Sequence, residues 1–140
     1  HQNQKIILAK PLTFMNNSGQ AVTLLANFFN LKPENILIVQ DDIDIAFGKI
    51  KLSFNKNSGG HYGIESIIQA LGNKAFWRLR IGTANKKIQE IKSIADKTAK
   101  KQFVADYVVK NWADQEMEQL KDVIKQAVEA VLHFIGSQKT

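Results

Sequence analysis

Residues 36–54 read ILIVQDDIDIAFGKIKLSF, and they contain two runs of different character. The first, Ile36 to Val39, is continuously apolar and rich in β-branched side chains, which predicts an interior strand covered on both faces. Residues 49–54 alternate polar and apolar side chains, which predicts a strand buried on one face. A strand of each kind within one sheet indicates that the sheet is mixed.

Two further strands are predicted outside this region. Residues 5–9 (KIILA) form a short apolar run that Pro11 ends, as is typical of a buried strand. Residues 76–81 (FWRLRI) alternate again, which places Arg78 and Arg80 on one face of a strand.

Apolar side chains at helical spacing predict three helices around these strands. The first begins near Asn17 or Ser18 and stops at Asn30, the second ends at Gly72, and the third runs from Asp114 towards Gly136. The stripes expected to face the core are Ala21, Leu24, Leu25, Phe28 and Phe29, then Ile64, Ile67, Ile68 and Leu71, and finally Met117, Leu120, Ile124, Ala127, Val128, Val131 and Ile135. Strands that alternate with helices predict an α/β fold, a single layered domain whose mixed, twisted sheet is flanked by helices.

The bulk composition limits the class of protein. A chain of 140 residues, 44% of them hydrophobic, is long enough for one domain, here 1–140. The absence of cysteine excludes disulfides and thiolate chemistry, which is consistent with the cytoplasmic location that we expect. No apolar run approaches the roughly 20 residues of a membrane span.

The net charge of +6 is concentrated in one part of the chain. Residues 78–101 hold eight basic side chains against Glu90 and Asp96, whereas the remainder is balanced. Such a concentration favours binding to a polyanion, most often a nucleic acid, although a solvated lysine-rich segment is the alternative. Within residues 84–101 the pattern supports only a marginal helix through Ile88, Ile91, Ile94 and Ala95, followed by a short helix at 103–108.

Three polar segments are candidates for a functional site: residues 14–19 (FMNNSG), the acidic residues Asp41, Asp42 and Asp44, and residues 57–63 (NSGGHYG). Strand-end carboxylates orient bases or bind Mg²⁺, and glycine-rich backbone approaches oxyanions closely. Each segment also has a structural interpretation: Asn16 as a turn or cap, the aspartates as turn formers, and His61 as a ring that donates to the backbone. The glycine run is not a P-loop, which disfavours nucleoside triphosphate chemistry.

In order and spacing, the segments KPLTFMNNSGQAV, ILIVQDDIDIAFGKIKL, NSGGHYGIESIIQALG and FWRLRIGT resemble the bacterial-type peptidyl-tRNA hydrolase family, from about Lys5 to Val109. The resemblance implies a single α/β domain that needs no metal or other cofactor. It also implies hydrolysis of the ester between a peptide and the 3′ end of tRNA, which recycles tRNA from abortive translation. The implied partner is peptidyl-tRNA, with no membrane and no obligatory protein partner.

Roles for individual residues follow from the matching motifs. By resemblance, Asp41 orients and polarises a catalytic histidine, and Asn16 places the attacking water or the scissile carbonyl. Phe14 and Asn16 match a substrate-contacting pair, while His61 and Tyr62 belong to a loop beside the substrate. The residues expected to meet tRNA phosphates are Lys49, Lys51, Arg78, Arg80, Lys86 and Lys87.

Two departures from the family pattern affect the expected function. The family's catalytic histidine belongs to a segment on the order of fifty residues that should precede Lys5 in a complete domain, and none of His1, His61 and His133 matches it. We therefore expect a truncated domain that is inactive, or nearly so, by itself. Tyr62 also stands where the family usually has asparagine.

These departures leave two other hypotheses open. The first is a non-catalytic relative that binds tRNA or other RNA through the basic surface. The second is a small-molecule hydrolase that uses Asp41 and His61.

Overall fold

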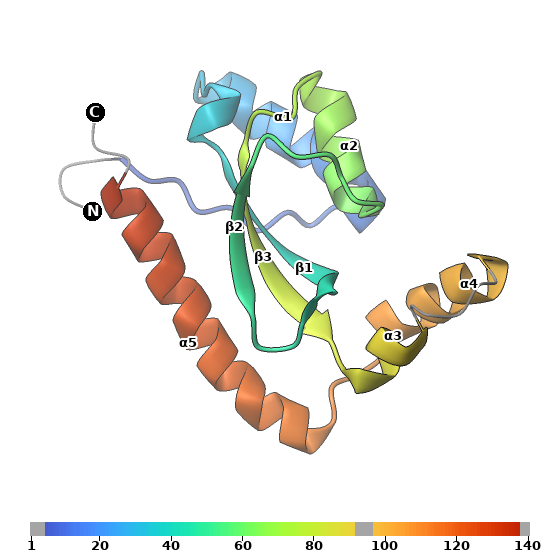
Figure 1. The fold of residues 1–140 in the computed structure, drawn as a ribbon. Coiled ribbons are helices and arrows are strands. Elements are labelled where there is room, and N and C mark those ends of the chain that lie inside the picture. The colour runs from blue at the N-terminus through green and yellow to red at the C-terminus, as the bar shows by residue number, and fades with distance from the viewer. Residues whose placement is uncertain (1–4, 92–96, 138–140) are drawn as a thin grey trace.

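The computed structural model describes residues 5–91 and 97–137, so His1 lies outside the described part. Short 3₁₀ helices, α-helices and strands follow one another along the chain (Figure 1). In order they are η1 (Met15–Asn17), α1 (Ser18–Phe28), η2 (Pro33–Asn35), β1 (Leu37–Ala46), β2 (Ile50–Phe54), α2 (Tyr62–Leu71), β3 (Trp77–Ala84), α3 (Lys86–Ile91), α4 (Lys97–Val108) and α5 (Asp114–Ser137).

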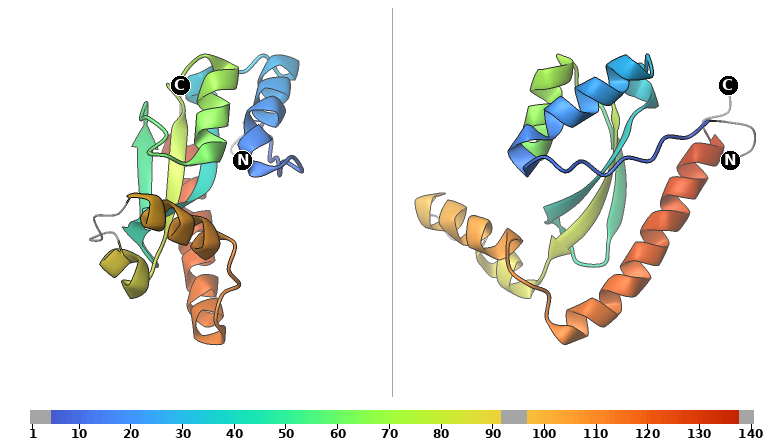
Figure 2. Two further views of the ribbon diagram at one scale, coloured as in Figure 1. Left: turned by 90° about the vertical axis from the view of Figure 1, so that its right-hand side faces the viewer. Right: turned by 180° about the vertical axis from the view of Figure 1, so that it is seen from behind.

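The described strands form one sheet in the order β1-β3-β2. Strand β3 pairs parallel with β1 and antiparallel with β2, so the sheet is mixed, as predicted. Helices α1 and α2 pack together at one end of the sheet, whereas α5 runs past β2 and β3 (Figures 1 and 2). The rings of Phe134 on α5 and Trp77 on β3 are 5.2 Å apart. The α/β architecture expected from the sequence is therefore confirmed.

Two of the strand predictions are wrong. Strand β1 is an outer strand of the described sheet rather than an interior one, and Val39 is 53% exposed. The middle strand is β3, where Leu79 is 2% exposed. Residues 5–9 form no strand and lie largely exposed, because no described strand pairs with their backbone. The apolar character of these residues therefore does not lead to burial within this part of the chain.

A close contact between α1 and α2 determines which side of α1 is buried. The core cluster consists of Val22, Ile64, Ile67 and Phe76. A methyl group on Gly19 would collide with the backbone carbonyl of Ser66, and the Gly19 N–H donates to Ser66 Oγ at 3.0 Å. The two helices therefore meet along the small side chains of α1.

This contact shifts the buried face of α1 away from the predicted stripe. The buried residues of α1 are Gly19, Val22 and Ala26, whereas Leu24 and Phe28, predicted to be buried, are mostly exposed. The C-terminal stop at Asn30 is confirmed by its positive φ of 51°.

The other predicted helices are present, with differences in their packing. Helix α2 ends at Gly72 in the left-handed conformation (φ 62°), as predicted. In α5 the buried residues are Val123, Ala127 and Phe134, so the predicted stripe is wrong at Met117, Ile124 and Val128, which are about half exposed. Of the marginal helix, α3 contains Ile88 and Ile91, while Ile94 and Ala95 lie outside the described residues. The predicted short helix at 103–108 lies within α4. None of the helices in the described ranges is both long and apolar enough to span a membrane.

Candidate active site

The acidic cluster lies within β1, which continues to Ala46. The prediction that the strand stops before these carboxylates is therefore wrong, and the aspartates have separate roles. Asp42 Oδ2 accepts a 2.6 Å hydrogen bond from Arg80 Nε, and its Oδ1 accepts a 2.8 Å bond from the Asp44 backbone N–H. Asp41, the neighbouring residue, lines a pocket and has half of its side chain exposed. Consecutive strand residues point to opposite faces, so this division follows from the strand itself.

His61 connects the beginning of α2 to Asp41. The Ile64 backbone N–H donates to His61 Nδ1 at 3.3 Å, which makes the ring the N-cap of α2. Since Nδ1 accepts this bond, the neutral ring carries its proton on Nε2, and Nε2–H donates to Asp41 Oδ1 at 3.3 Å. The ring therefore accepts from the backbone, which reverses the structural interpretation made from the sequence. Neither ring nitrogen has a free lone pair, so His61 in this geometry is not a general base.

The hydrogen bond from His61 lowers the pKa of the Asp41 carboxyl, and partial burial opposes this effect. A carboxyl whose folded-state pKa lies below its ordinary pKa stabilises the folded protein at pH values above that ordinary pKa. This contribution is lost as the pH falls through the lowered folded-state pKa. Asp41 is therefore ionised at neutral pH and available as a hydrogen-bond acceptor.

The segment Phe14–Asn17 lies against the same end of α2. A methyl group on Gly63 would come within 3.0 Å of Met15 Cγ and 3.1 Å of His61 Cε1, so a glycine here lets η1 approach the His61 loop. Phe14 and Asn16 are exposed beside this contact, and Tyr62, the first residue of α2, is 58% exposed. The structure thus brings together the two segments that the sequence singled out, while Phe14 and Asn16 lie outside the lining of the pocket.

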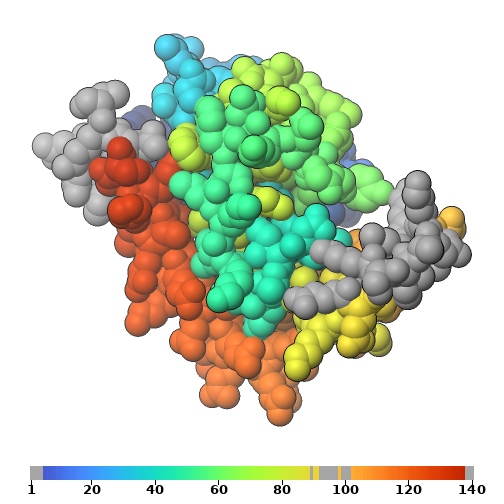
Figure 3. Space-filling view, viewed as in Figure 1, coloured from blue at the N-terminus to red at the C-terminus, as the bar shows by residue number. Residues whose placement is uncertain are grey.

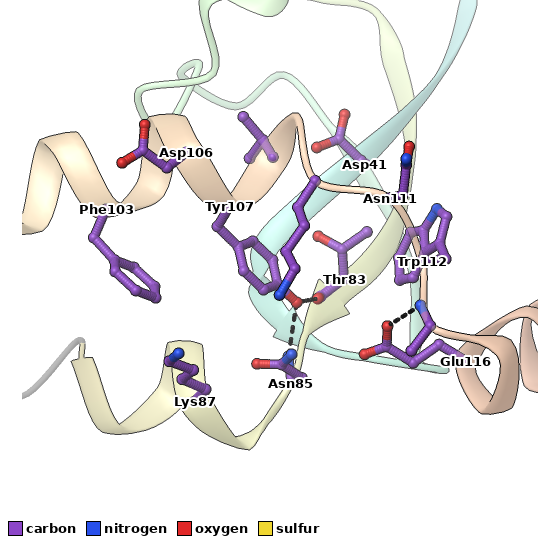
Figure 4. A pocket seen from close by; sticks show the side chains of 13 residues that line it. Asp41, Thr83, Asn85, Lys87, Phe103, Asp106, Tyr107, Asn111, Trp112 and Glu116 are labelled. Atoms are coloured by element: carbon purple, nitrogen blue, oxygen red, sulfur yellow. Dashed lines mark hydrogen bonds between the residues drawn. The ribbon is translucent and has the colours of Figure 1, made fainter.

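A pocket of about 470 Å³ lies between Asp41 and the segments around α3 and α4 (Figure 4). Its lining comes from β1, the end of β3, α3, α4, the connection between α4 and α5, and the start of α5. The residues are Asp41, Thr83, Asn85, Lys87, Phe103, Asp106, Tyr107, Val108, Lys110, Asn111, Trp112, Ala113 and Glu116. Asp41 stands at one side of this lining, with the rings of Tyr107 and Trp112 below it in Figure 4.

Sequence reasoning missed most of this lining. Tyr107 was predicted as part of an amphipathic helix, but its hydroxyl donates to the Thr83 carbonyl at 2.6 Å and accepts from the Asn85 N–H at 3.4 Å. Burial raises the pKa of Tyr107, so the phenol is protonated at neutral pH. The Trp112 ring lies 5.4 Å from Phe47. An aromatic residue at helical spacing is the same pattern whether it faces a core or a pocket, so the sequence held no signal for this use.

The basic residues proposed for tRNA binding fall into two groups. Lys49, Lys51, Lys86 and Lys87 are exposed, and β2 and α3, which carry three of them, are both visible on the face drawn in Figure 3. Arg78 and Arg80 have partners within the chain. The Arg80 partner is Asp42, and Arg78, only 3% exposed, donates from Nη2 to the Asn57 carbonyl at 3.0 Å. In this geometry, Arg78 anchors the glycine loop rather than presenting a cation to solvent.

Arg78→Met is expected to destabilise the protein by about 1–3 kcal/mol, because it removes a buried hydrogen bond from a charged donor. Burial, followed by the nearby Arg80, lowers the pKa of Arg78. The measurement is urea unfolding at neutral pH. Lys74→Met is the matched control, since Lys74 Nζ also contacts Asn57, at 2.9 Å, but from an exposed position. Equal effects of the two substitutions would contradict an anchoring role.

Comparison with known proteins identifies the family. A family model described as "Peptidyl-tRNA hydrolase" matches residues 1–140. The chain belongs to the peptidyl-tRNA hydrolase family. Among curated peptidyl-tRNA hydrolases, that of Aquifex aeolicus (strain VF5) is 39% identical over 132 residues, which cover 94% of this chain. That of Lactobacillus helveticus (strain DPC 4571) is 36% identical over 135 residues and 96% of this chain.

The solved structures agree with this assignment. The crystal structure of peptidyl-tRNA hydrolase from Acinetobacter baumannii matches with a TM-score of 0.71 and 28% identity, covering 91% of this chain and 59% of that one. The chain spans 62% of the Aquifex peptidyl-tRNA hydrolase and 66% of the Lactobacillus protein. Among the residues described by the structure, no group of three or more His, Asp or Glu side chains forms a metal site.

Proposed function

We propose that this chain forms the larger, C-terminal portion of a single-domain hydrolase that cleaves the ester between peptide and tRNA in peptidyl-tRNA. Asp41 carries the proposal: it is an ionised carboxylate on β1, it accepts a hydrogen bond from His61, and it lines a pocket. In the proposed reaction Asp41 orients an imidazole that removes a proton from water, and it stabilises the imidazolium that results. Asn16 places the water or the scissile carbonyl, and Phe14 and Tyr62 flank the substrate.

The catalytic base in this proposal comes from outside residues 1–140. Both ring nitrogens of His61 are occupied, one by Ile64 N–H and the other by the proton donated to Asp41. A His-Asp pair that activates water needs a ring whose second nitrogen is free. The same occupancy argues against the small-molecule hydrolase hypothesis, which requires His61 as the base.

Hydrolysis of an N-blocked aminoacyl-tRNA tests this proposal. The 140-residue chain is expected to give little or no turnover, and the same chain extended by the upstream segment of its own gene is expected to give turnover. Full activity of residues 1–140 alone would contradict the assignment of the base to another segment. A melting curve of both proteins checks that each is folded.

The alternative is a non-catalytic RNA-binding relative, which the exposed tyrosine at position 62 favours because the family usually has asparagine there. Tyrosine replaces a short amide, which both donates and accepts, with a bulky ring and one hydroxyl. Under this alternative the extended chain would still bind tRNA but would not hydrolyse it. A Tyr62→Asn variant that gains turnover would identify the tyrosine as the cause.

A further inference from the structure

The His61 ring is shared between a helix and a carboxylate. Its Nδ1 caps α2 by accepting from Ile64 N–H, and its Nε2 is 3.3 Å from Asp41 Oδ1. The His61 side chain is 18% exposed and that of Asp41 is 51% exposed. The donor is therefore held within the protein, while the acceptor reaches towards the pocket.

The cap determines the chemical form of the ring. A backbone N–H only donates, so the nitrogen that faces Ile64 must be unprotonated. In the neutral imidazole the proton then lies on Nε2, directed at Asp41. The start of α2 thus selects the tautomer that donates to the carboxylate, and no other contact is needed to explain this choice.

We propose that His61 is a positioning residue for Asp41, whose Oδ1 it holds by donation from Nε2–H so that Oδ2 is left to accept from the catalytic imidazole. This role differs from the one predicted from the sequence, in which His61 belongs to a loop beside the substrate. It makes the rigid end of α2, rather than the exposed loop before it, the support for the carboxylate. The hydrogen-bond partners of the ring lie on β1 and on α2 itself, at Asp41 and Ile64, of which Asp41 is the titratable one.

Two substitutions separate the two contacts of the ring. Asparagine is a preferred N-cap, so His61→Asn keeps an acceptor for Ile64 N–H, but its side chain is one bond too short to reach Asp41. Glutamine places its amide nitrogen about where Nε2 lies, so His61→Gln restores the donor to Asp41 while weakening the cap. Each variant therefore retains one of the two contacts.

The test is NMR of the 140-residue chain without tRNA. The chain has three histidines, so the ring nitrogens of His61 can be assigned by comparison with the two variants. At mildly alkaline pH, the wild-type ring is expected to carry its proton on Nε2 alone. A proton on Nδ1, or an equal mixture of the tautomers, would overturn the proposal.

The second readout is the titration of the Asp41 carboxyl carbon. In His61→Asn the titration midpoint is expected to move to higher pH, because the hydrogen bond that lowers it is lost, while the melting temperature stays close to that of the wild type. In His61→Gln the midpoint is expected to return towards the wild-type value, while the melting temperature falls by about 4 °C. An Asp41 midpoint that does not move in His61→Asn would also overturn the proposal.

The catalytic meaning of this contact rests on the proposed function, but neither readout does. If the NMR results are as expected and the extended chain does not hydrolyse its substrate, the proposed function fails and the positioning of Asp41 stands. If the extended chain hydrolyses the substrate and Asp41 titrates alike in all three proteins, the positioning role fails instead.

Discussion

Gly19→Ala is expected to destabilise the protein by about 3 kcal/mol, the largest loss of stability among the substitutions considered. The added methyl group would lie inside contact distance of the Ser66 carbonyl and of Ala70 Cβ. A backbone carbonyl cannot rotate aside as a long side chain can, so α1 and α2 must move apart. Their separation would open the core at Val22 and Ile64.

The measurement is urea unfolding followed by circular dichroism, with Gly136→Ala as the matched control. Gly136 is also helical, but an added Cβ would meet nothing within 4 Å. There, alanine is expected to stabilise the protein by up to about 1 kcal/mol, because glycine loses more backbone entropy on folding. If Gly19→Ala is tolerated as well as Gly136→Ala, then the close packing of α1 on α2 is not required for stability.

Binding of deacylated tRNA is expected to weaken roughly hundredfold between about 50 and about 200 mM salt. The exposed lysines Lys49, Lys51, Lys86 and Lys87 supply about four phosphate contacts, and each contact contributes about 0.9 to the slope of log K against log salt. Arg78 and Arg80 are left out of this sum because their side chains have partners in the chain. The measurement is a salt series of fluorescence anisotropy titrations.

Replacing Lys86 and Lys87 together with glutamine is expected to reduce the magnitude of that slope by about 2. Lys121→Gln with Lys125→Gln on α5 is the control, since it removes the same charge from exposed positions away from the pocket. An equal change in slope for both pairs would mean that binding responds to net charge alone. A slope close to zero in the unmodified chain would contradict tRNA binding by these lysines.

The sequence predicts best those elements in which local pattern and packing agree. Alternation at residues 49–54 and at 76–81 gave the two strands that pair with each other, and Gly72 gave the end of α2. The predictions fail where a contact with a residue distant in the sequence determines which side chains are buried. Which face of α1 is buried depends on the close approach of Gly19 to Ser66. The sequence of residues 18–28 alone does not show that approach.

The residues of the candidate site also fall into those that the sequence predicts and those that it does not. The motifs identified Asp41, Asn16 and the His61 loop, and the structure brings these segments to one end of α2. The partners of Arg78 and Arg80 were not foreseen, because alternation shows which face a side chain occupies but not what it meets there. Tyr107 and Trp112 were missed because the connections around α4 place them, and those connections carry no recognisable motif.

The Arg80–Asp42 ion pair has a consequence for experiments on tRNA binding. Both side chains are mostly shielded from solvent, at 21% and 11% exposure. Removing Arg80 deletes a cation and also leaves the poorly exposed Asp42 carboxylate, next to Asp41, without its counter-charge. Weaker tRNA binding by an Arg80 variant would therefore combine electrostatic repulsion with structural damage. Only a double variant that also neutralises Asp42 separates a lost phosphate contact from an unmasked acid.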